Sequence, residues 1–200
     1  MCAPSRSDRY PSGDDLPGWL CMMQHHGVPT RLLDWTESVM LAAYFALVHD
    51  GAGPAPAIWV LTPRLMNRVA IGKESVFLLK EPPCKELVEQ AFLDKAGGGG
   101  HEGAESRKPA YAALGSELGS RMMVQQTAFT IHAGAEALDQ HPRGAEFLTK
   151  IELCGGESAE ITRLVRYSAL TRCVVFPDLE NLGRDISDWP KDKRRLVDRV

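Results

Sequence analysis

The chain has 200 residues, a length that fits one domain and allows it to bury a core of its own. Its 44% hydrophobic and 24% charged residues are typical of a globular protein, and a net charge of −3 provides no general attraction to nucleic acid or anionic membranes. No apolar run approaches the roughly 20 residues of a membrane span and no signal-peptide pattern is visible, so we expect a soluble cytoplasmic protein without a membrane partner.

The cysteine content argues against a disulfide framework and indicates a reducing compartment, because five cysteines stand at irregular spacings. Cys21 and His25 are four residues apart, which is half of a plausible zinc site. No second pair follows at ligand spacing, and Cys21 lies on the apolar stripe of a predicted helix. We therefore expect no metal.

The N-terminal part is predicted to form an irregular lead-in over residues 1–13, followed by a helix over residues 16–26. Asp15 supplies the N-cap of this helix, and Gly27 stands where a left-handed C-cap residue belongs.

A second helix is predicted immediately downstream, with Thr36 or Ser38 as its cap. Residues 39–47 are apolar on every side, which is typical of a helix buried in the middle of a domain.

The remaining segments alternate between strand and helix patterns. We predict strands over residues 57–62, 76–80, 122–132, 147–153 and 173–176, helices over 85–96, from Ser158 onward and over 177–186, a flexible loop over 97–109, and a basic tail over 190–200. Interleaved helices and strands indicate an α/β or α+β fold. We expect a single domain over residues 14–189, with a mixed central sheet flanked by helices.

Chemically capable side chains gather in the stretch QHHGVPTRLLDWTESVMLAAYFA, which begins at Gln24. His25 and His26 end the first helix, and Arg31 is close enough in sequence to pair with Asp34. Such an arginine, with the helix N-terminus after Thr36, could grip a phosphate or carboxylate ligand. The alternative, favoured on composition alone, is a structural clamp that ties the loop to the core.

Two glutamines in the predicted strand over residues 122–132 form a second candidate group. Because successive strand residues face opposite sides, either Gln125 or Gln126 should point inward. That amide would either bond a neighbouring backbone or bind a ligand hydroxyl, and the residues leave both interpretations open. Arg121 is either a solvated strand end or a second cation for the same ligand.

The first stretch resembles the signature of the FRG domain family, found in bacteria and phages. The segments RMMVQQTAFTIH and VVFPDLENLGRDI resemble later parts of the family in the same order. The family also has an aromatic–Arg–Gly motif upstream, whereas this chain offers there only Arg6 and Arg9, neither followed by glycine. We therefore expect an N-terminus truncated relative to the family.

The order of these motifs is similar, more distantly, to an ADP-ribosyltransferase core. That resemblance implies NAD as ligand, the turn from Thr30 to Ser38 as part of its site, and Gln125 or Gln126 where such enzymes usually hold a glutamate. An amide cannot supply the negative charge that stabilises the transition state, so we expect this copy to be inactive as a transferase.

Two functional hypotheses follow. The first is a nucleotide-binding domain, with NAD as the ligand, in a toxin or phage-defence setting. Its binding residues would be His25, His26, Thr30, Arg31, Asp34, Thr36 and Arg121, and its catalytic candidates Gln125 and Gln126. The second is a non-catalytic module that recognises nucleic acid or a protein.

Overall fold

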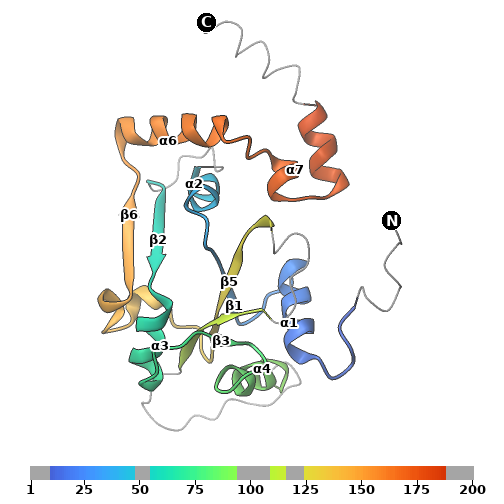
Figure 1. Ribbon diagram of the computed structural model, residues 1–200, viewed down its shortest axis with the longest axis vertical. Helices are drawn as coiled ribbons and strands as arrows, with labels where there is room; N and C mark the ends of the chain where they lie inside the picture. The colour runs from blue at the N-terminus through green and yellow to red at the C-terminus, as the bar shows by residue number, and fades with distance from the viewer. Residues whose placement is uncertain (1–9, 48–54, 94–108, 116–123, 188–200) are drawn as a thin grey trace, which may run out of the picture. The chain divides into compact units, whose positions relative to one another are not determined.

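The computed structural model describes residues 10–47, 55–93, 109–115 and 124–187 (Figure 1). The chain forms two compact units. Unit 1 contains Met1–Trp35, Trp59–Glu117 and Ala128–Thr149, and unit 2 contains Thr36–Ile58, Leu118–Thr127 and Lys150–Val200. The expected class is confirmed, since helices flank a mixed sheet.

Helix α1 (Leu16–His25) begins and ends as its sequence predicts. The Asp15 carboxylate accepts a hydrogen bond from the backbone N–H of Gly18 at 3.1 Å, which satisfies one of the donors left open in the first turn. A Cβ at position 18 would lie 2.2 Å from that carboxylate, so the cap requires glycine there. Gly27 follows the helix with a φ of +75°, the left-handed geometry of a C-terminal cap.

The sheet has the strand order β1-β5-β4-β3. Its strands are β1 (Leu32–Thr36), β5 (Thr127–His132), β4 (Ala110–Leu114) and β3 (Phe77–Leu78). Strand β4 runs antiparallel to β5, with Ala110 opposite His132, and parallel to β3. In unit 1, α3 (Pro63–Ile71) packs on β4, and α1 contacts α4 (Cys84–Leu93).

A buried amide joins α3 to β4. Asn67 is fully buried and donates to the carbonyls of Ser75 at 2.6 Å and Ala112 at 3.0 Å. Its Oδ1 accepts from the Ala112 N–H at 2.8 Å. The neighbouring residues Met66, Ala112 and Phe147 form an apolar cluster, so the helix is fixed by both packing and hydrogen bonds.

Unit 2 is built around α2 (Val39–Leu47), with α6 (Gly155–Tyr167), α7 (Arg172–Val175) and a further helical segment over residues 179–187. Its core consists of the side chains of Leu41, Ala43, Tyr44, Val165 and Val175.

Helix α2 departs from the prediction of a helix buried on every side. Leu41 and Tyr44 are buried, but Val39 is 77% exposed and Phe45 is 39% exposed. The reason is that α2 packs against α6 along one face. The uniform apolar sequence could not reveal which face that would be.

Strands β2 (Ala57–Leu61) and β6 (Leu148–Glu152) pair in a separate two-stranded sheet, and two short 3₁₀ helices, η3 (Leu138–Gln140) and η4 (Gly144–Glu146), precede β6. Both strands lie close to their predicted positions. The sequence analysis missed α3 and β4. The predicted loop over residues 97–109 lies outside the described residues except for Pro109, and so does the basic tail.

The predicted strand over residues 173–176 is wrong, because α7 is helical there. The carboxylate of Asp185 accepts a hydrogen bond from the Cys173 N–H at 2.8 Å and so satisfies a donor at the start of this helix. Burial opposes the ionisation of Asp185, yet hydrogen bonds from Cys173 and Thr171 lower its pKa below the ordinary value. The partner lies twelve residues downstream, beyond the reach of a local pattern.

None of the described helices is both long enough and apolar enough to cross a membrane.

The Asn67 contacts give a stability prediction. Asn67→Ala should lower the free energy of unfolding by about 2–4 kcal/mol, because it leaves buried backbone groups without partners. Urea denaturation measures the change. Arg64→Ala, on the exposed side of the same helix, is the control and should change stability by less than about 0.5 kcal/mol. Equal effects of the two substitutions would refute the role given to Asn67.

Candidate functional site

The signature residues of unit 1 form a hydrogen-bonded chain around the end of α1. The hydroxyl of Thr30 donates to Oε1 of Gln24, and the amide of Gln24 donates to the carboxylate of Asp34 at 2.6 Å. The Thr30 oxygen also accepts from the Leu32 N–H at 3.0 Å. Asp34 thus contacts Gln24, which was not among the predicted site residues.

Arg31 connects the signature to the end of β5. Its guanidinium Nη1 donates to the carbonyl of Ala133, and its own carbonyl accepts from the His132 N–H at 3.0 Å. These contacts with the backbone of β5 and of the residue after it support the interpretation of a structural clamp. Arg31 therefore positions the segment that follows β5.

His25 and His26 close α1 and are both exposed. Their rings meet edge to face, with centroids 5.0 Å apart. Because both rings are exposed, this pair is a candidate contact for a polar ligand.

In unit 2, the two glutamines lie in a turn before β5, so their predicted place inside a strand is wrong. Thr36 donates its hydroxyl to the Gln125 carbonyl at 2.7 Å, and the Glu37 N–H donates to the Gln126 carbonyl at 3.0 Å. The Gln125 amide donates to the Val175 carbonyl at 3.0 Å. This turn therefore connects the start of α2 with the end of α7.

The surroundings of the two glutamines differ. Gln125 is half-buried and its amide bonds a neighbouring backbone, as the structural interpretation expects. Gln126 is exposed, with a left-handed φ of +47°. This strained backbone conformation, which ends the regular strand, gave no signal in the sequence.

Thr36 and Ser38, at the start of α2, form further hydrogen bonds beside this turn. Ser38 caps α2, since Leu41 N–H lies 3.4 Å from its hydroxyl, and Thr36 accepts from the Ser38 N–H at 3.1 Å. Arg121 lies outside the described residues. Because Arg31 and Gln126 belong to different units, their predicted grouping around one ligand stays a prediction.

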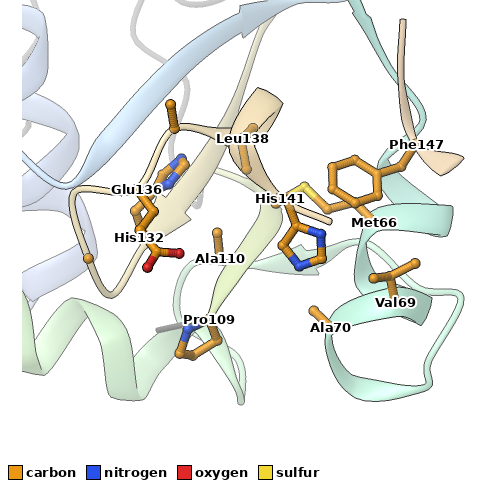
Figure 2. Close-up of a pocket in the computed structure, with 12 residues that line it drawn as sticks. Met66, Val69, Ala70, Pro109, Ala110, His132, Glu136, Leu138, His141 and Phe147 are labelled. Carbon is orange, nitrogen blue, oxygen red and sulfur yellow. The ribbon is translucent and has the colours of Figure 1, made fainter. Parts of the chain in front are cut away.

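Unit 1 contains a pocket of about 160 Å³ at the end of β5 (Figure 2). It is lined by Met66, Val69, Ala70, Pro109, Ala110, His132, Gly134, Glu136, Ala137, Leu138, His141 and Phe147. The predicted site residues are absent from this lining. Arg31 acts on it indirectly, since the Ala133 carbonyl that it holds lies between His132 and Gly134 in the chain.

His132 belongs to a buried hydrogen-bond network. The Trp35 indole donates to Thr130 Oγ1 at 3.1 Å, and the same oxygen lies 2.8 Å from His132 Nε2. Thr130 is fully buried, so its hydroxyl proton needs a partner, which Nε2 provides as acceptor. The network therefore assigns the imidazole proton to Nδ1. Burial also lowers the pKa of His132 below its ordinary value, which favours the neutral ring.

His141 and Glu136 complete the polar part of the pocket. His141 Nδ1 accepts the N–H of Arg143 at 3.1 Å, so the neutral ring carries its proton on Nε2. Its ring meets Phe147 edge to face, with centroids 5.5 Å apart. In Figure 2, His132 and Glu136 lie on one side, Phe147 and Met66 on the other, and His141 between them.

The lining of the pocket is chemically mixed. It combines N–H donors from two imidazoles with a carboxylate and an apolar wall. Within the part of the chain that the structure describes, no three His, Cys, Asp or Glu side chains are grouped as metal ligands. Burial, with the charges of Asp15 and Asp34, raises the pKa of the Cys21 thiol to about 12, so this cysteine is a poor ligand and nucleophile.

Sequence reasoning missed this pocket because it singled out neither His132 nor His141. The available signal was a histidine at the end of a strand, followed by the short segment AGAEALDQH. The decisive contacts come from α3 and β4, which the sequence analysis had not assigned.

The comparison with family models matches residues 3–52 to the FRG domain. The resemblance seen in the signature is therefore confirmed over this segment, which is a quarter of the chain. No curated protein and no solved structure matches the chain.

The two glutamines should respond differently to substitution. Gln125→Ala removes the hydrogen bond to Val175 and leaves a partly buried carbonyl unpaired, so it should destabilise the protein by about 1–2 kcal/mol. Gln126→Ala, which keeps the backbone contact with Glu37, should cost less than about 0.5 kcal/mol. Urea denaturation of both variants provides the measurement. A larger loss for Gln126→Ala would contradict the assignment.

Stability should depend on pH through His132. Its pKa is lowered in the folded state, so the unfolded chain binds a proton more readily. This contribution to stability is present above the unfolded pKa of about 6.5 and is lost as the pH falls through the lower folded value. His132→Gln keeps an acceptor for Thr130 but cannot titrate, so it should flatten the decline between about pH 7 and pH 5. An unchanged decline, followed by urea denaturation, would contradict this role.

Proposed function

We propose that this protein binds a nucleotide, with NAD as the first candidate, and that one ring of the nucleotide enters the pocket lined by His132, Glu136 and His141. The observation that carries the proposal is the connection between Arg31 of the FRG signature and this pocket. The guanidinium of Arg31 holds the carbonyl of Ala133, next to the pocket wall. A residue of the signature is thus linked by a hydrogen bond to the wall of the pocket.

Size and charge support a divided binding mode. A pocket of about 160 Å³ is smaller than the roughly 300–1,000 Å³ of sites that enclose whole drug-sized ligands. The ribose and pyrophosphate would therefore lie outside it. The candidates for contacts with the phosphates in unit 1 are the guanidinium of Arg31 and the exposed rings of His25 and His26.

We propose binding without efficient ADP-ribosyl transfer. The Gln125 amide already donates to the Val175 carbonyl, and a glutamine cannot provide the negative charge of a catalytic glutamate. The proposed setting is the bacterial cytoplasm, in a toxin or phage-defence role that uses recognition of the nucleotide.

Calorimetric titration of the full chain with NAD tests the proposal. Binding should weaken at least about ten-fold in His141→Ala, which removes a pocket donor, and in Arg31→Ala, which releases the pocket wall. Arg64→Ala, an exposed change in unit 1, should leave the affinity unchanged. Circular dichroism should confirm that the variants are folded. Absence of NAD binding by the unaltered chain would overturn the proposal.

A second candidate, recognition of a protein, is favoured by the exposed apolar side chains of α2. Val39 is 77% exposed and Met40 and Phe45 more than a third exposed, and adjacent apolar side chains of this kind are typical of protein contacts. A null titration with NAD, together with concentration-dependent association in sedimentation that Val39→Glu abolishes, would favour this candidate.

A further inference from the structure

We infer that Thr130 is a positioning residue that makes the pocket at the end of β5 select a single ring with a hydrogen-bond acceptor on its edge, such as a pyridine-type nitrogen or a ring carbonyl. Thr130 acts through His132, by determining which nitrogen of that imidazole carries the proton. The inference rests on the proposed function for the link to a nucleotide, and it deepens that function by naming the chemical class of the group that is bound.

The hydroxyl of Thr130 is held between two side chains of unit 1. It is fully buried, accepts the indole N–H of Trp35 at 3.1 Å and lies 2.8 Å from Nε2 of His132. Because an indole only donates, Nε2 is the acceptor that these partners provide for the hydroxyl proton. A proton on Nε2 would leave a buried hydroxyl without an acceptor, an arrangement that native interiors rarely contain.

The ring of His132 therefore presents one kind of hydrogen-bonding group to the pocket that it lines. Burial lowers its pKa, which favours the neutral ring, and a neutral imidazole has a single N–H. With Nε2 bonded to Thr130, that N–H is on Nδ1. Among the residues that the structure describes, none forms a hydrogen bond with Nδ1. Its N–H is thus a donor that a ligand can use.

The volume of the pocket selects one ring. The pocket measures about 160 Å³. An apolar cavity of about 150 Å³ in another protein accommodates benzene, so this pocket holds a ring of that size. The side chains of Met66, Val69 and Phe147 provide the apolar surface against which such a ring can pack.

The fixed donor selects the edge of that ring. A ring nitrogen with a lone pair, or a ring carbonyl, accepts the Nδ1–H of His132. A ring whose edge offers only an N–H would place two donors against each other, and both would lose their bonds to water without gaining a partner. A histidine that could exchange its tautomer would accommodate either edge, so the selection depends on the hydroxyl of Thr130.

The tautomer of His132 is the first test. In the full chain labelled with ¹⁵N-histidine, the shifts of the two ring nitrogens should show the proton on Nδ1 at about pH 8, where the ring is neutral. Thr130→Val keeps the shape of the side chain but lacks the hydroxyl, so the shifts should move toward a mixture of tautomers. Thr130→Ser keeps the hydroxyl and should preserve the Nδ1 form. A proton on Nε2 in the unaltered chain would overturn the inference, whether or not Thr130→Val folds.

Two small rings provide the second test, because pyridine only accepts a hydrogen bond and pyrrole only donates one. Titrations followed by the imidazole signals of His132 should show pyridine binding at least about three-fold tighter than pyrrole, the ratio expected from one ordinary hydrogen bond. Thr130→Val should narrow this preference, and Thr130→Ser should restore it. Tighter binding of pyrrole, or no response of His132 to either ring, would overturn the inference.

Quinoline and NAD complete the experiment. Quinoline has the acceptor of pyridine on a fused second ring, so binding as tight as that of pyridine would contradict the single-ring assignment. A preference for pyridine without NAD binding would support the inference and refute NAD as the ligand. NAD binding to a chain in which His132 does not respond to pyridine would refute the inference and leave nucleotide binding in place.

Discussion

The hydroxyl of Thr130 is the constraint on which the candidate site depends. It is fully buried, accepts the indole proton of Trp35 and bonds His132, and so joins the signature strand β1 to the pocket through β5. Because a buried hydroxyl must both accept and donate, one side chain fixes the tautomer of the imidazole and the position of its ring. The hydrogen-bonding group that His132 can offer to a ligand is thus determined by contacts inside the sheet.

The polar side chains of the signature stretch also act by fixing the positions of other groups. In unit 1 its polar side chains bond one another and the end of β5, and in unit 2 they hold a turn against the start of α2. The contacts of Arg31 and Thr36 end on backbone carbonyls. A sequence motif can therefore be strict for structural reasons and still determine where a ligand binds, through the segment that it positions.

Helix α1 was predictable because its signals are local. Its apolar residues lie within the helix, and the capping residues Asp15 and Gly27 lie beside it. The turn at Gln125 was not predictable, since the partners that hold it are Thr36 and Val175, far away in the sequence. Strand β4 was missed because its sequence AYAAL has no alternation of apolar and polar residues. The candidate site was the least predictable part of the structure, because the pocket forms only where α3, β4 and the segment after β5 come together in space.

The left-handed backbone of Gln126 has a consequence for comparing related chains. Its carbonyl accepts a hydrogen bond from the Glu37 N–H, and its side chain is exposed. The turn therefore depends on the main-chain conformation of this residue. Glycine and asparagine adopt this conformation most readily and would preserve that contact. Homologues that exchange Gln126 for either residue would thus keep the backbone of this turn.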